Sequence, residues 1–230
     1  MKSHLAFLFS TTLAALVPVA VAQFTTFHWS VGQAIPDGSA VGIANTQALN
    51  VPGAAISSLR VNLEITGRGG AAFNGDLYAT LVHDSGFSVL LNRPGRRDGD
   101  PLGYGDNGLN VTFDDRPGSG DIHLYRLELS GDHYLPLGHA LTGSWATDAR
   151  GVDPGSVLDI HRRNSDLSCF TGLNPNGLWT LYVADLEPGN LAMLTSWGLE
   201  MTMVPEPEGS GVLLGLCALV WTIGRRRERR

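Results

Sequence analysis

The sequence predicts an all-β protein, built as an antiparallel jelly-roll β-sandwich. Short segments in which apolar and polar residues alternate recur along the chain, as in strands with one buried face. Gly, Pro, Asn and Asp fill the gaps between these segments, where turns need them. No long segment of the central chain has the period of an amphipathic helix. Many short strands at such spacing are typical of a sandwich or jelly roll.

The chain opens on a segment typical of a secretory signal peptide. Residues 1–22 carry one early positive charge at Lys2, then an apolar stretch, and close on small residues ending at Ala22. A basic start, an apolar middle and a small-x-small end are the marks of such a peptide. We therefore predict cleavage after Ala22 and export of the rest of the chain.

Five central segments carry the alternation, and each places its apolar residues on one face. We expect Trp179 and Trp197 to lie in the core. The predicted inward residues are Leu59, Val61, Leu63 and Ile65; Leu77, Ala79 and Leu81; Tyr125, Leu127 and Leu129; Trp179, Leu181 and Val183; and Trp197, Leu199, Met201 and Met203.

The central domain, residues 23–203, is more acidic than the whole chain, whose net charge is −6 because of a basic tail. Between Gln23 and Val204, ten Arg and no Lys stand against fifteen Asp and four Glu. This balance argues against nucleic acid or an anionic membrane surface as partners. Cys169 has no second cysteine within the domain, so no internal disulfide forms, and we expect it to be a small buried residue rather than a reactive thiol.

An Asp-rich segment at residues 98–115 is the candidate metal site. Ca²⁺ takes about six to eight oxygen ligands, which several short acidic side chains on one loop can supply. The segment is not an EF-hand, because Leu102 occupies the fifth position and no Glu closes it. The alternative is a solvated Asp/Gly loop, and Asp76 and Asp185 are second contributors or turn residues. The candidate ligands are Asp98, Asp100, Asp106, Asp114 and Asp115, beside Asn107.

The sequence shows no catalytic site. A serine hydrolase needs a nucleophile and a base within hydrogen-bond reach. No serine of the domain lies in a Gly-x-Ser-x-Gly setting, and the histidines are scattered: His28, His83, His123, His133, His139 and His161. We therefore expect a protein that is not itself catalytic.

The chain ends in residues 204–230, which have three parts. The motif Pro205-Glu206-Pro207 is followed by an apolar stretch, residues 209–224, and an Arg-rich block, residues 225–230. This order resembles the PEP-CTERM sorting signal of exopolysaccharide-producing Gram-negative bacteria. The resemblance implies a transient inner-membrane anchor with a cytoplasmic C-terminus, cut near the motif by an exosortase-like membrane peptidase. A permanent single-pass anchor is the alternative.

The central domain also resembles a known family. A Gly-Asp-Leu strand precedes a Gly-x-Trp-Thr-Leu-x-Val-x-Asp strand and a Ser-Trp-x-Leu strand. This succession looks like the P domain, or P/Homo B domain, that follows the catalytic domain of kexin- and furin-like subtilases. The resemblance implies an eight-stranded jelly roll associated with serine endopeptidases. The matching residues are Gly75, Asp76, Leu77, Gly177, Trp179, Thr180, Leu181, Val183, Asp185, Ser196, Trp197 and Leu199.

Three functions stay open for a protein that we expect outside the cell or on its surface. The first is a non-catalytic binding or structural module linked to an exopolysaccharide matrix. The second is a P domain that assists a separate subtilase in trans. The third is a carbohydrate-binding module, in which exposed aromatic residues stack on sugars unless they belong to the core: Trp29, Tyr104, Tyr134 and Trp145.

Overall fold

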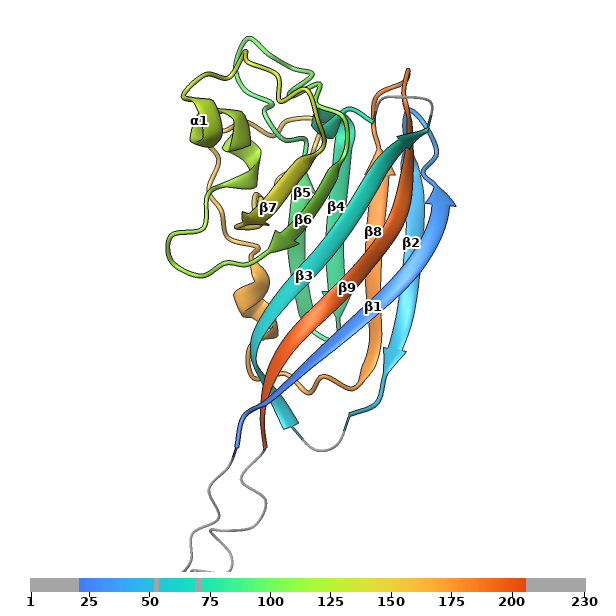
Figure 1. Ribbon diagram of the computed structural model, residues 1–230, viewed down its shortest axis with the longest axis vertical. Helices are drawn as coiled ribbons and strands as arrows, with labels where there is room; N and C mark the ends of the chain where they lie inside the picture. Colours follow the sequence, from blue (N-terminus) through green and yellow to red (C-terminus); the bar gives the residue numbers. More distant parts are fainter. Residues whose placement is uncertain (1–20, 52–53, 69–71, 206–230) are drawn as a thin grey trace, which may run out of the picture. The chain divides into compact units, whose positions relative to one another are not determined.

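Two sheets form the described part of the computed structural model, residues 21–51, 54–68 and 72–205 (Figure 1). The larger sheet of this part has five strands in the order β1-β9-β3-β6-β7, and the smaller has four in the order β2-β8-β4-β5. The strands are β1 (Gln23–Ala34), β2 (Ser39–Leu49), β3 (Ala54–Arg68), β4 (Leu77–His83), β5 (Gly86–Asn92), β6 (Leu109–Phe113), β7 (Leu141–Trp145), β8 (Gly177–Asp185) and β9 (Leu191–Pro205).

The core lies between the sheets, so the prediction of a mostly β sandwich is confirmed. Trp179 on β8 and Trp197 on β9 are both 0 % exposed. The ring of His83 stacks on Trp179 with centroids 4.0 Å apart, and Trp29 packs on Trp197 at 4.5 Å. All predicted inward residues of β3, β4, β8 and β9 are buried, as the alternation of one buried face requires.

The long strand β9 lies between β1 and β3 in the larger sheet. It pairs antiparallel with β1, from Gln23↔Met203 to Ala34↔Met193, and with β3 on its other side. Figure 1 shows β3, β9 and β1 running side by side across one face of the sandwich. The first and the last described strands are therefore direct neighbours.

One pair departs from the prediction of a purely antiparallel fold. Strands β6 and β7 run parallel, with Leu109 opposite Leu141 and Phe113 opposite Trp145. Parallel neighbours need a crossover of a dozen or more residues. Residues 114–140 supply it, and they contain the short helices η2 (Ile122–Leu124) and α1 (Tyr125–Ser130).

The predicted strand at residues 125–129 is wrong, because this segment forms α1. Tyr125 is buried, but Leu129 is 56 % exposed. The Asp121 side chain accepts a hydrogen bond from the His123 N–H and starts the preceding turn, and Gly131, with φ of 75°, donates its N–H to the Leu127 carbonyl and ends the helix. Five residues are too few to separate a period of two from a helical period.

The predicted terminal segments fall almost wholly outside the described residues. Only residues 21 and 22 of the predicted signal peptide and residues 204 and 205 of the predicted tail are described. Within the described residues, no helix combines the length and the apolar character that a membrane crossing requires.

Candidate functional site

Residues 93–176, between β5 and β8, form a long segment that we call the loop region. It contains β6 and β7 of the larger sheet, three short helices and most of the irregular chain. Figure 1 shows α1, β6 and β7 together at one side of the sandwich. Binding sites are often carried by loops that a rigid scaffold positions, so the contacts that hold this region decide what it can do.

A buried ionic network ties the loop region together. The His123 Nδ1 lies 2.7 Å from Asp148 Oδ2, and the Arg150 Nη1 donates to Asp148 Oδ1 at 3.2 Å. The Arg150 Nη2 also donates to Asp121 Oδ2 at 2.8 Å. Asp148 and His123 are both 0 % exposed. The network therefore joins residues 121–123 to residues 148–150, and backbone bonds from Asp148 and Ala149 attach both to β5.

The surroundings of His123 favour its imidazolium form. Its Nδ1 faces a carboxylate and its Nε2 faces the carbonyl oxygen of Arg96 at 2.8 Å, so both ring nitrogens must donate. Burial alone would lower the pKa of His123, but the charge and hydrogen bond of Asp148 raise it above its usual value. The cation and its carboxylate partner satisfy each other away from water.

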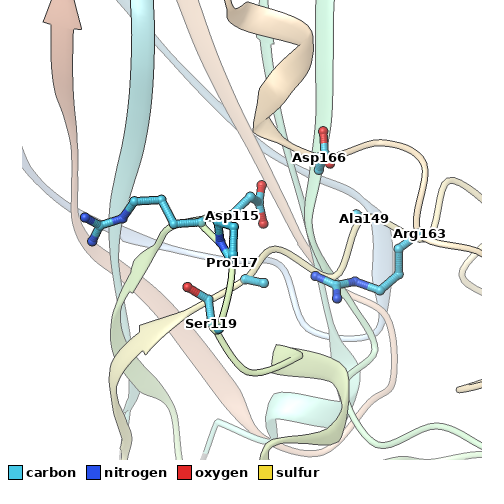
Figure 2. A pocket seen from close by; sticks show the side chains of 9 residues that line it. Asp115, Pro117, Ser119, Ala149, Arg163 and Asp166 are labelled. Carbon is cyan, nitrogen blue, oxygen red and sulfur yellow. The ribbon is translucent and has the colours of Figure 1, made fainter.

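A polar pocket of about 320 Å³ opens in the same region (Figure 2). Figure 2 shows Asp115, Pro117 and Ser119 on one side of it and Arg163 and Asp166 on the other. The full lining is Asp115, Arg116, Pro117, Gly118, Ser119, Ala146, Ala149, Arg163 and Asp166. Groups of both signs line the pocket, which suits a polar or charged group of a partner better than an apolar ligand.

The charged side chains of the pocket wall are fixed by their own hydrogen bonds. Asp115 accepts from the backbone N–H of Thr147 at 2.7 Å and of Leu167 at 2.8 Å. The Arg163 Nη2 donates to the Thr147 carbonyl at 2.7 Å. Asp166 accepts from the Ser168 N–H at 3.0 Å and begins the short helix η3 (Leu167–Phe170). The pocket is therefore preformed rather than assembled by a ligand.

The predicted calcium ligands lie in separate environments. Asp106 is buried and accepts from the Arg126 Nε and the Tyr125 hydroxyl, both at 2.6 Å. Burial raises the pKa of Asp106, but these hydrogen bonds outweigh it and lower the pKa below its usual value. Asp114 pairs with Arg60 and Arg116, Asp100 pairs with Arg97, Asp115 holds the pocket wall, and Asp98 is exposed.

The structure does not gather these five carboxylates into one site. Among the described residues, no group of three or more His, Cys, Asp or Glu side chains is arranged to hold a metal ion. Arginines or backbone N–H groups already occupy four of the five carboxylates. Calcium binding by residues 98–115 stays a prediction, which a comparison of the melting temperature in calcium and in chelator would test.

The candidate sugar-stacking residues divide between core and surface. Tyr104 and Trp145 are buried, and Trp29 is half-buried against Trp197. Tyr134 is 77 % exposed, with the Arg97 guanidinium 5.0 Å from its ring centroid. Of the four, only Tyr134 offers an open ring.

The prediction that Cys169 is buried is wrong. Its neighbour Phe170 takes the core position on η3, and Cys169 faces outward, with its Sγ donating to the Phe87 carbonyl at 3.3 Å. Partial burial raises the pKa of the thiol, which disfavours the reactive thiolate.

The sequence did not point to the ionic network. Asp121, His123, Asp148 and Arg150 lie in two loops that no motif connects, and His123 stood only among scattered histidines. The one available signal was in the sequence: Asp121 and His123 stand on either side of Ile122, an apolar residue that belongs to the core.

Comparisons with known proteins give little beyond this description. No family model and no curated protein matches the sequence. The chain is similar to a chain in the crystal structure of the Aeromonas sobria serine protease (ASP) and chaperone (ORF2) complex, with 16 % identity and a TM-score of 0.41. The match covers 82 % of this chain and 28 % of that chain. The class defined by fold and site is thus a two-sheet β-sandwich with an ionically fixed loop region, and the functional proposal stands on its own residues.

Proposed function

We propose that this protein is a non-catalytic binding module, a P-domain-like jelly roll that is exported and sorted to the cell surface. The two-sheet architecture and the order of the Gly-Asp-Leu, Trp-Thr-Leu and Ser-Trp strands support the family part of the proposal. The terminal segments support the sorting part. A link to an exopolysaccharide matrix follows from the resemblance of the tail alone.

The single observation that carries the non-catalytic part is the environment of His123. A His–Asp pair is the base half of a serine-hydrolase triad, and its free ring nitrogen must reach a nucleophile. Here that nitrogen is bonded to the Arg96 carbonyl, and the ring is fully buried. The pair therefore supports the loops and has no access to a substrate.

The rigid loop region supports a binding role. The preformed polar pocket offers Arg163 and Asp166 to a partner. Exposed apolar side chains on and after α1 extend the available surface: Leu127, Leu129, Tyr134 and Leu135. A mixed surface of fixed charges and exposed apolar side chains suits a polypeptide partner, such as a subtilase engaged in trans. The open ring of Tyr134 favours the second candidate, a carbohydrate ligand.

A pull-down of the purified protein against its host's secreted proteins and polysaccharide tests the proposal. Recovery of a subtilase supports the trans-acting module, and recovery of polysaccharide supports the matrix-linked or carbohydrate-binding module. An Arg163→Ala variant should lose a partner that uses the pocket, whereas Tyr134→Ala should lose a sugar. Robust peptide cleavage by the pure protein would contradict a non-catalytic role, and its loss in a His123→Gln variant would assign the cleavage to His123.

The sorting part has its own measurement. Mass spectrometry of the protein from its host should find a mature N-terminus at Gln23 and a mature C-terminus near residues 205–207. A C-terminus at Arg230 would rule out processing and favour the permanent anchor.

A further inference from the structure

Two long strands, β1 and β2, end the two sheets on the side of the sandwich that lies away from α1 (Figure 1). Within the described residues each has one strand neighbour, β9 for β1 and β8 for β2. The two strands span 12 and 11 residues. The outer edge of each strand therefore presents a row of backbone N–H and C=O groups that no described strand pairs. We call β1 and β2 together the open edge.

The opposite edges of the two sheets are protected. The loop region covers β5, because Asp148, Ala149 and Ser165 form backbone hydrogen bonds with it. At the other end of the larger sheet, β7 has only five residues. Covering an edge strand and shortening it are two ways in which proteins prevent pairing with another chain. The open edge has neither, and the register shift of β1 between Ser30 and Gln33 leaves the stretch before it regular.

Charged residues are missing from the open edge. No Asp, Glu, Lys or Arg occurs in β1 or β2, although every residue of β1 is exposed or half-buried. The neighbouring strands do carry charge, with Arg60 and Glu64 on β3 and Glu200 on β9. A Lys or Glu on an edge strand is a common means of keeping it unpaired, whereas depletion of charged residues marks the centre of a protein–protein interface.

A row of half-buried apolar side chains runs along β1. Phe27, Trp29 and Val31 pack against the core but remain partly exposed. The rings of Phe27 and Trp29 are stacked, with centroids 6.1 Å apart and planes 7° from parallel, and Trp29 in turn contacts the buried Trp197. The margin of the core is thus open to solvent along β1, and a further strand on this edge would remove apolar surface from water.

The regular part of β1 is suited to pairing with a second copy of itself. A two-fold axis at Phe27 would set residues 24–30 of two copies antiparallel, with aromatic side chains opposite aromatic or β-branched ones at the centre, and such pairs stabilise a sheet. Charges near a two-fold axis face their own copies, so an uncharged strand favours this symmetric contact, whereas it offers nothing to a charged partner. The opposing pairs are Phe27 with Phe27, Thr25 with Trp29, Thr26 with His28, and Phe24 with Ser30.

We propose that two copies of the protein associate through their open edges, with β1 of one copy paired antiparallel to β1 of the other over residues 24–30. The two larger sheets then join into one continuous sheet across the axis, and the half-buried rows of both copies cover each other. The loop region lies on the other side of the sandwich and stays free (Figure 1). The dimer therefore presents two loop regions at once, which strengthens binding to a partner with repeated sites.

Sedimentation velocity of the purified protein over a range of concentrations tests the proposal. The wild type should be a dimer that dissociates on dilution. The double variant Thr26→Lys, His28→Lys places like charges opposite each other twice across the axis, and it should raise the dissociation constant at least about tenfold. The double variant Thr26→Lys, His28→Glu places a lysine opposite a glutamate twice and should restore the dimer. Both replaced side chains are exposed, and Thr26 lies opposite Glu200 of β9, which accommodates a lysine.

A matched control adds the same charge to the opposite edge of the same sheet. Thr142→Lys, Ser144→Lys, at two exposed residues of β7, should leave the dimer unchanged. Circular dichroism verifies that each variant is folded. Hydrogen exchange of the wild type needs no variant: amides of β1 should gain protection as the concentration rises, and those of β7 should not.

Three outcomes would overturn the proposal. The first is a wild type that stays monomeric at every concentration, which includes the case in which another segment of the same chain covers β1. The second is a dimer that Thr26→Lys, His28→Lys leaves intact, because the contact would then lie elsewhere. The third is a Thr26→Lys, His28→Glu variant that dissociates as readily as the double lysine variant, because residues 26 and 28 would then not face each other.

Discussion

The apolar core between the sheets and the ionic network of the loop region are stabilised by different forces. Between the sheets, apolar side chains such as Leu63, Leu181 and Trp197 are fully or almost fully buried. In the loop region, His123, Asp148 and Arg150 are buried to the same degree, but each is charged and paired. Apolar burial tolerates small shifts in geometry, whereas a buried ion pair stabilises only with its partners in place. The core should therefore supply stability and the loop region should supply precision of shape.

The largest expected effect lies in the core. Trp179→Ala should lower the free energy of unfolding by about 3–5 kcal/mol, because it removes a fully buried ring and the support of His83 and Phe170. The neighbouring Leu178→Ala, at a residue that is 63 % exposed, should change it by less than about 0.5 kcal/mol. Urea denaturation of both variants measures the difference. A loss under about 1 kcal/mol for Trp179→Ala would contradict its place in the core.

A smaller effect is expected in the loop region. Asp148→Asn keeps the shape but removes the charge that satisfies His123 and Arg150, so it should cost about 1–3 kcal/mol. It should also loosen residues 121–123 and 148–150, which hydrogen exchange would detect as lost protection there, with β9 unchanged. Equal loss of protection in both regions would mean that the two are not energetically distinct. Asp98→Asn, on an exposed side chain, is the control.

The end of α1 provides a test of how this helix is terminated. Gly131 has φ of 75° and open space around its Cα, so Gly131→Ala adds only backbone strain, about 1–2 kcal/mol. Gly105→Ala, where φ is not positive and the nearest atom to an added Cβ is 3.8 Å away, should be nearly neutral. Thermal unfolding compares the two. Equal melting temperatures would mean that Gly131 does not end the helix.

The contribution of the loop region to stability should fall gradually as the pH rises. The pKa of His123 is raised in the folded state, so its contribution to stability is complete below the unfolded pKa of about 6.5 and is lost as pH rises through the folded pKa. Denaturation between pH 6 and 9 should show stability falling with pH more steeply in the wild type than in a His123→Gln variant. Parallel curves would show that His123 is neutral in the folded protein.

The sequence predicted four strands from their alternation but missed others, among them β5, which has almost no solvent-facing side. β3, β4, β8 and β9 alternate, so their buried faces follow from the pattern. In β5 only Phe87 is exposed, because residues 148–149 and 165 bond to Val89 and Leu90. A strand that is covered on both faces does not show the alternation of apolar and polar residues by which strands are recognised in a sequence.

The candidate site was harder to predict for a related reason. Asp-rich spacing in residues 98–115 suggested a metal ion, but arginines distant in sequence reach Asp106 and Asp114. Pairs such as His123 with Asp148 form because the fold brings two separate loops together, and no periodic pattern in the sequence predicts that contact. The Gly-Asp-Leu and Val-x-Asp motifs contain Asp76 and Asp185, but only the structure shows that these two residues lie at the same end of one sheet, where Leu77 pairs with Asp185.

The position of β9 between β1 and β3 has a consequence for the time course of folding. Strands β1 and β3 do not pair with each other; both pair with β9, which comes last along the described chain. The larger sheet therefore cannot be completed while residues 191–205 are still being synthesised or exported, although β3, β6 and β7 can pair before then. Contacts between segments so far apart in sequence also form slowly. The smaller sheet can pair β4 with β5 early, but its β2 and β4 wait for β8, so the nascent domain stays open until its final residues arrive.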